Sequence, residues 1–207
     1  MHARTTMLTG DPRLVDAGIA HVRDHVWPMM RGMSGALGVS MLVDRRTGRC
    51  VVTAAWAGAE AMAVAPEDVR ELRRQVAEQL GAPDPEVAEW EIAVFHRQQA
   101  SGAGACVRVT SLDLPRGGSE AVVDSFRAGL LPRLEHLAGF RSVSLLVDPQ
   151  HDRAVAAVTY ESRAAMHRAG GQGLALRTDF ARVTGAAVTA VDEYDLALAH
   201  LRVPELA

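Results

Sequence analysis

Apolar residues fall at three- and four-residue spacings over residues 15–33 and again over residues 123–137. This spacing is typical of a helix with one buried side. Asp11 before Pro12 supplies a helix cap followed by proline, the usual start of such a helix. Pro28 and Pro132 stand at corresponding places in the two segments, and each proline removes one helical hydrogen bond. We therefore expect a long amphipathic helix in each half, bent or restarted at the same place.

Alternating and β-branched residues predict strands around these helices. The expected strands cover residues 3–8, 38–43, 49–57 and 87–96 in the first half, and 105–114 and 191–200 in the second. Residues 45–48 have the composition of a tight hairpin turn. A second helix is expected after each hairpin, with Val69, Leu72, Val76 and Leu80 on its buried face in the first half and with Leu176 and Phe180 in the second.

The chain is a tandem repeat. The segment GALGVSMLVDRRTGRCVVTAAWAGAEAM at Gly35 matches GFRSVSLLVDPQHDRAVAAVTYESRAAM at Gly139, an offset of 104 residues (139 − 35). The sequence QQASGAG between the copies has the composition of a short flexible connection. We expect a first unit at residues 1–97, a linker at 98–104, a second unit at 105–200 and a tail at 201–207.

Each unit has the order strand, helix, strand, strand, helix, strand. This order predicts a four-stranded antiparallel sheet with helices on one face, which leaves the other face in need of a cover. A bare apolar sheet face is too large for a soluble monomer, so the two units are expected to cover each other. The predicted fold class is α+β, with two tandem ferredoxin-like βαββαβ units packed sheet to sheet.

Three paired motifs resemble one known family. They are WPMMRGMSG with LLPRLEHLAG, SMLVDRRTGRCVVTAAW with SLLVDPQHDRAVAAVTY, and EWEIAVF with DEYDLAL. The chain resembles the dimeric α+β barrel superfamily, especially its antibiotic-biosynthesis-monooxygenase-like (ABM-like) branch. This resemblance implies a pocket for a small molecule. Members include cofactor-independent oxygenases of aromatic polyketides, haem-degrading enzymes, isomerases and proteins without known activity. The haem-degrading and quinone-forming members rely on an asparagine, and this chain contains none, which disfavours those two activities.

Composition removes several classes of function. The net charge is −3, and 22 basic residues are scattered among 25 acidic ones, which disfavours nucleic acid and anionic lipid as partners. All 22 basic residues are arginine, so lysine chemistry is unavailable. Two isolated cysteines indicate neither a disulfide framework nor a zinc site. We expect no cofactor, no signal peptide or membrane span, and a cytoplasmic location, and a homo-oligomer of the two-unit chain stays open.

Charged residues that recur in both units are first interpreted as salt bridges. The residues at matching positions are Arg4 and Arg108, Asp44 and Asp148, Arg49 and Arg153, Arg73 and Arg177, and Glu89 and Glu193. Asp44 could form an ion pair with Arg49 across the first hairpin, and Asp148 with Arg153 across the second. Glu89 and Glu91 lie on one face of the last strand, where clustered carboxylates could raise one another's pKa and accept protons. Glu89 is therefore one candidate base, although hydrogen bonding to arginine is the favoured role.

Histidines offer further candidates. His21 and His25 are one helical turn apart and could share a metal, but no third ligand is evident and an exposed surface is the favoured interpretation. His25 stays a candidate catalytic residue for the first-unit pocket. His96 recurs as His200 at the end of the last strands, where either a polar strand end or a proton-transfer role fits.

Aromatic residues differ between the units, which suggests that the units do different work. The candidate pocket of the first unit combines Trp27, Trp56 and Met62 with His25, and that of the second combines Tyr160, His167 and Arg177 with Glu161. Ordinary core filling is the alternative for Trp27 and Trp56. The leading hypothesis is a small-molecule-binding barrel that acts as a cofactor-independent monooxygenase on a planar aromatic or polyketide-like compound. A histidine or carboxylate would be the base and Arg177 would stabilise the anion. The rival is a non-catalytic protein that binds a ligand or partner.

Overall fold

The structure is a computed structural model that describes residues 1–63, 66–201, 204 and 206. The chain forms two compact units. The first comprises Met1–Trp90 and the segment that begins at Asp195, and the second comprises Glu91–Tyr194 and the end of the chain. Residues 202, 203, 205 and 207 of the predicted tail lie outside the described residues. The repeat boundaries at 97 and 105 stay a prediction, because the compact units divide within strands.

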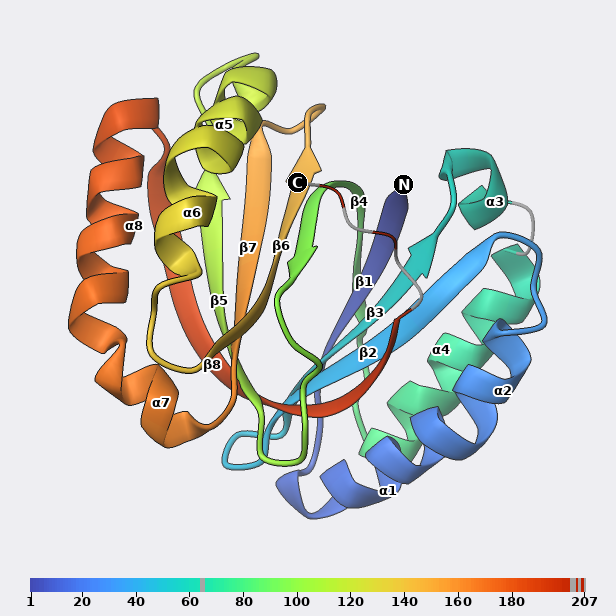
Figure 1. The fold of residues 1–207 in the computed structure, drawn as a ribbon. Helices are drawn as coiled ribbons and strands as arrows, with labels where there is room; N and C mark the ends of the chain where they lie inside the picture. Colours follow the sequence, from blue (N-terminus) through green and yellow to red (C-terminus); the bar gives the residue numbers. More distant parts are fainter. Residues whose placement is uncertain (64–65, 202–203, 205, 207) are drawn as a thin grey trace. The chain divides into compact units, whose positions relative to one another are not determined.

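Both halves of the chain follow the predicted βαββαβ order (Figure 1). The first half contains β1 (His2–Thr9), a 3₁₀ turn (Pro12–Leu14), α1 (Val15–His21), a π-helical turn (Val22–Val26), α2 (Trp27–Met30), β2 (Ala36–Asp44), β3 (Arg49–Trp56), α3 (Ala59–Ala63), α4 (Pro66–Leu80) and β4 (Glu86–Arg97). The second contains β5 (Cys106–Asp113), α5 (Ser119–Ser125), a π-helical turn (Phe126–Leu130), α6 (Leu131–Leu134), β6 (Phe140–Asp148), β7 (Arg153–Tyr160), α7 (Arg163–Arg168), α8 (Gly170–Thr184) and β8 (Ala187–Leu201). The short helices α3 and α7 were not predicted, since five or six residues are too few to show a helical period.

The first helix of each half is interrupted at its proline, as predicted. A π-helical turn ends two residues before Pro28, and another ends two residues before Pro132. In each turn a backbone amide bonds to the carbonyl five residues earlier, from Trp27 to Val22 and from Leu131 to Phe126. A proline has no amide hydrogen and its ring collides with the preceding turn, so a wider turn just before it relieves the crowding.

The first hairpin turns at the predicted residues 45–48, and the second hairpin has the same register. Asp44 stands opposite Arg49 in the β2–β3 ladder, and Asp148 stands opposite Arg153 in the β6–β7 ladder. The predicted ion pair of Asp148 with Arg153 is confirmed, with Arg153 Nη2 2.6 Å from Asp148 Oδ2. The same repeat therefore builds the same hairpin twice.

The last strand of each half is longer than predicted and has a neighbouring strand on each side. The part of β4 from Glu91 onward pairs with β6, and the part of β8 from Asp195 onward pairs with β2. A register shift marks each ladder at a corresponding place, beside Ala93 in β4 and Ala197 in β8. The hydrogen-bonded strand order β1-β3-β2-β8-β5-β7-β6-β4 closes into a barrel. The expectation that each sheet uses only its own four strands was thus incomplete.

Two hydrophobic cores hold the helices on the strands, one in each unit. Leu72, Val76 and Leu80 of α4 are buried in the first, and Leu176 and Phe180 of α8 are buried in the second. These are the helical faces that the apolar spacing predicted. None of the helices in the described part of the chain is long and apolar enough to cross a lipid bilayer.

The pairing of β2 with β8 can be tested at Gly38. A Cβ atom at this position would overlap the His200 carbonyl and lie 2.8 Å from Leu201 Cα of β8. We expect Gly38→Ala to lower the free energy of unfolding by about 1–3 kcal/mol, because the two strands must separate. Urea denaturation measures the loss. Gly58→Ala is the control, since no atom lies within 4 Å of the added carbon. Equal stability of the two variants would contradict the pairing.

Candidate functional site

A buried arginine with an ion-pair partner lies in the second unit. Arg108 of β5 is 7% exposed. Its Nε and Nη2 donate hydrogen bonds to Oε1 of Glu193 on β8, at 3.1 and 2.7 Å. Its Nη2 also lies 3.3 Å from the Met166 carbonyl oxygen. Arg108 and Glu193 were each expected to form a salt bridge, and the one that they form with each other joins the first and last strands of the repeat.

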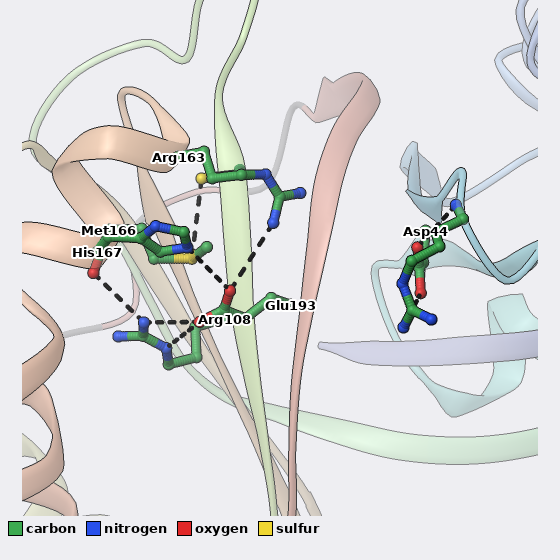
Figure 2. A network of polar contacts seen from close by, with 8 residues as sticks. Asp44, Arg108, Arg163, Met166, His167 and Glu193 are labelled. Atoms are coloured by element: carbon green, nitrogen blue, oxygen red, sulfur yellow. Dashed lines mark hydrogen bonds and ion pairs between the residues drawn. The ribbon is translucent and has the colours of Figure 1, made fainter.

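Three cationic or protonatable side chains surround Glu193 (Figure 2). Besides Arg108, Arg163 Nη1 lies 3.8 Å and His167 Nε2 lies 3.5 Å from Glu193 Oε2. Burial alone raises the pKa of Glu193, but the hydrogen bond and charge of Arg108, with the neighbouring His167, outweigh it. The pKa of Glu193 therefore lies below its usual value, and the carboxylate stays ionised at neutral pH.

Tyr160 and Arg177 complete the polar group. Tyr160 of β7 is buried, and its ring centroid lies 5.8 Å from the guanidinium carbon of Arg108. Burial raises the pKa of the Tyr160 hydroxyl, and the charges of Arg108 and Arg177 offset only part of this rise. Burial, and then the charge of Arg108, lowers the pKa of Arg177. No described residue forms an ion pair or hydrogen bond with Arg177.

These side chains line a cavity between the helices and the strands of the second unit. The cavity has a volume of about 40 Å³. Its lining consists of Arg108, Thr110, Leu112, Phe126, Leu130, Leu134, Ala156, Val158, Tyr160, Gly173, Leu176, Arg177, Phe180 and Val188. The walls are thus mostly apolar, and the charged groups among them are both arginines. Pockets for drug-sized ligands measure roughly 300–1,000 Å³, so this space holds about one water molecule in the present conformation.

The first unit has a corresponding cavity of about 40 Å³. Its lining residues Arg4, Leu8, Leu72, Arg73 and Val76 stand 104 positions before Arg108, Leu112, Leu176, Arg177 and Phe180. Arg4 donates hydrogen bonds to Glu89 at 3.0 and 2.5 Å, as Arg108 does to Glu193. Burial, followed by the charge of Arg4, lowers the pKa of Arg73. The repeat therefore carries the two-arginine arrangement twice.

The structure brings together only some of the predicted site residues. Tyr160 and Arg177 share the cavity of the second unit, and His167 contacts Glu193 in the same unit. Glu161, the fourth predicted residue there, lies instead 3.0 Å from Arg141 Nη2. This second-unit group is the candidate functional site.

The predicted residues of the first unit are dispersed. Trp27 stacks on His200 with ring centroids 5.2 Å apart, and the exposed His25 stacks on His21 at 4.9 Å. Trp56 and Met62 are buried in the hydrophobic core. The described lining of the first-unit cavity includes none of the four predicted pocket residues.

The remaining two predicted catalytic residues have other partners. Glu89 is paired with Arg4, and His96 Nε2 lies 2.7 Å from Glu135 Oε1 while its ring stacks on Phe140. The roles assigned to His25, Glu89 and His96 stay predictions. Within the described residues, no group of three or more His, Cys, Asp or Glu side chains could hold a metal ion together.

Sequence reasoning missed Gly173 and gave Arg108 only a structural role. A signal for both was present in the repeat. Arg108 and Arg177 recur as Arg4 and Arg73, whereas Gly173 replaces Val69 in the middle of the buried helical face. A glycine at a core position of a helix leaves a space that a larger side chain would fill, which indicates a role for that space.

Solved structures share this fold at low sequence identity. A proposed monooxygenase from Lactobacillus acidophilus superposes with a TM-score of 0.71 and 10% identity over 97% of this chain and 96% of that chain. An anthrone oxidase-like protein superposes with a TM-score of 0.64 and 12% identity over 100% and 95%. A ferredoxin-fold protein of Listeria monocytogenes related to antibiotic biosynthesis monooxygenases has a TM-score of 0.53 and 12% identity, with 94% of each chain covered. The predicted α+β fold with two ferredoxin-like βαββαβ repeats is confirmed.

Close sequence relatives occur in Mycobacterium tuberculosis, whereas no family model matches the chain. The uncharacterised protein Rv2557 is 45% identical over 206 residues, which cover 100% of this chain and 92% of the relative. The uncharacterised protein Rv2558 is 44% identical over 207 residues, which cover 100% of this chain and 87% of the relative. With such identity over its whole length, the chain belongs to the same family as Rv2557 and Rv2558.

Proposed function

We propose that the chain binds a planar aromatic or polyketide-like molecule in the second-unit cavity and oxidises it as a cofactor-independent monooxygenase. The observation that supports this most is the cavity itself, in which apolar walls meet two arginines and a tyrosine hydroxyl. An apolar pocket with a few convergent polar groups is the usual form of a small-molecule site. Solved structures with the same fold include proteins named as monooxygenases, which is consistent with this function.

Ligand entry requires the cavity to open. Helix α8 begins with Gly170, Gly171, Gln172 and Gly173, and glycine destabilises a helix by about 1 kcal/mol per residue relative to alanine. The first turn of α8 is therefore the wall of lowest intrinsic stability, and it lies over the arginines. Movement of this turn would open the end of the cavity beside Arg108, Tyr160 and Arg177 without disturbing the strands.

The arginines suit the first chemical step of such an enzyme. A substrate that donates electrons directly to oxygen must first lose a proton and become an anion. A guanidinium about 4 Å from that anion contributes on the order of 4 kcal/mol at an effective dielectric constant near 20. The carboxylate of Glu193 cancels part of this field. One oxygen atom would then enter an activated methylene outside the aromatic ring system as a carbonyl, which forms no quinone, and the other would leave as water with the two hydrogens.

Glu193 is a poor base for this step, because its pKa is held below the usual value. A carboxylate paired with Arg108 accepts a proton less readily than a free one. In the proposed mechanism the field of Arg108 and Arg177 therefore favours ionisation of the substrate, and Glu193 fixes the orientation of Arg108. His167, whose Nε2 lies 3.5 Å from Glu193 Oε2, would receive the proton.

A non-catalytic ligand-binding protein is the second candidate. The cavity volume of about 40 Å³ favours it, because the present space excludes an aromatic ring. This candidate keeps the same pocket and the same arginines but omits the reaction with oxygen.

Oxygen uptake with a panel of hydroxyaromatic ketones that carry an activated methylene tests the oxidation. We expect uptake above the uncatalysed rate with the purified protein and a loss of at least ten-fold in kcat/KM for Arg177→Gln, because the developing anion loses one positive charge. Arg73→Gln is the matched control, since it removes the corresponding arginine of the first unit. Binding of these ketones without any oxygen uptake would favour the non-catalytic function, and equal losses in both variants would contradict the assignment of the site to the second unit.

The charge state of Glu193 predicts a pH dependence of stability. Its folded pKa lies below the unfolded value of about 4.3, so ionisation of Glu193 stabilises the folded state above that pH. This contribution is lost as the pH falls from about 4.3 through the lower folded pKa. Thermal denaturation between pH 3 and pH 7 should show that Glu193→Gln lowers Tm at neutral pH and flattens the decline at low pH. Glu89→Gln, in the more exposed pair with Arg4, is the comparison, and an unchanged decline in Glu193→Gln would contradict the prediction.

A further inference from the structure

We infer that the space in front of Gly173 binds a single oxyanion, so the ligand of the second unit is an apolar molecule with one carboxylate or ionised hydroxyl. This inference rests on the proposed ligand pocket and gives its charge requirement. It does not depend on the oxidation.

Three polar atoms converge on the place where Gly173 has no side chain. A Cβ atom at Gly173 would lie 3.5 Å from Arg108 Nη1, 3.6 Å from Arg177 Nη1 and 3.9 Å from Tyr160 Oη. All three atoms can donate a hydrogen bond, and two belong to positively charged groups. A ligand oxygen close to that point would therefore meet three donors from three different elements, β5, β7 and α8.

One of these donors is buried and unsatisfied. Arg108 is 7% exposed, and its Nη1 has no hydrogen-bond partner among the residues that the structure describes. Glu193 and the Met166 carbonyl accept bonds from Nε and Nη2, so Nη1 is the nitrogen left for another partner. A buried donor without an acceptor is destabilising, and a bound oxyanion would supply the missing acceptor.

The charge of the cavity also favours an anion. Arg108 and Arg177 both line it, and the described lining contains no acidic residue. Glu193 is paired with Arg108 and also lies near Arg163 and His167 (Figure 2). Its charge offsets only part of the effect that burial and the charge of Arg108 have on the pKa of Arg177. Two neighbouring arginines repel each other. One negative oxygen between them would accept a charge-assisted hydrogen bond from each.

The size of the cavity fits an oxyanion group better than a whole ligand. A volume of about 40 Å³ accommodates about one water molecule, which is close to the size of one oxygen. The apolar residues Leu130, Phe126 and Phe180 then stand along the remaining wall, where the body of the ligand would lie after α8 has opened.

The first unit has the arginines but not the open space. Val69 occupies the position of Gly173 and lines the corresponding cavity. Trp56 replaces Tyr160, is buried in the core and does not line that cavity in its described part. The side chain of Val69 and the missing tyrosine hydroxyl make the oxyanion site a property of the second unit.

Isothermal titration of the full chain with benzoate and with benzamide, its neutral analogue of the same shape, tests the inference. We expect benzoate to bind at least ten-fold more tightly than benzamide, with an affinity that falls as the salt concentration rises. Gly173→Val, which installs the residue of the first unit, should abolish benzoate binding because the added methyl groups occupy the place of the oxygen. This variant should stay folded, since valine is a better helix former than glycine. Gly173→Ala, with a smaller blocking group and a higher helix propensity, provides a second folded variant.

Arginine variants complete the test. Arg177→Gln should weaken benzoate binding at least ten-fold, whereas Arg73→Gln in the first unit should leave it unchanged. Equal affinities for benzoate and benzamide, absence of benzoate binding to the unmodified chain, or full benzoate binding by Gly173→Val would each overturn the inference. Oxygen uptake is measured separately. Benzoate binding without uptake of oxygen keeps the oxyanion site and removes the oxidation, and uptake without benzoate binding does the reverse.

Discussion

An arginine held by a glutamate across two strands is the interaction on which each unit depends. The pair forms between residues 85 positions apart, Arg4 with Glu89 and Arg108 with Glu193, and so joins the first strand of a repeat to its last. A charge that is largely buried must have a partner, and this requirement fixes which residues of the two strands face each other. The same bond turns the guanidinium so that, in the second unit, one nitrogen remains for the cavity.

The sequence predicted the parts of the fold that are repeated and local. The hairpins and the interruptions at Pro28 and Pro132 could be predicted, because each depends on residues close together in the chain. The offset of 104 residues could be predicted because the two copies keep matching residues without a gap. The pairing of β4 and β8 with a neighbour on each side could not be predicted, since the alternation of apolar residues shows that a strand exists but not how many neighbours it has. No special residue type marks the matching bulges at Ala93 of β4 and Ala197 of β8.

The site was predicted less well than the fold, for a physical reason. Histidines and tryptophans attract attention in a sequence, yet His25 proves exposed and Trp56 belongs to the core. Tyr160 and Arg177 were singled out and do share a cavity. This cavity differs from its counterpart because Gly173 has no side chain. The sequence shows the glycine but not which atoms surround it, so the space could not be assigned a role from the sequence.

The shared last strands have a consequence for how the two pockets can differ. One repeat by itself would lack the β8 partner of β2 and the β6 partner of β4. The two copies therefore need each other for strand pairing, but each cavity is lined by residues of its own copy. Because both copies stand in one chain, a single difference such as Val69 against Gly173 alters one pocket and leaves the other as it is.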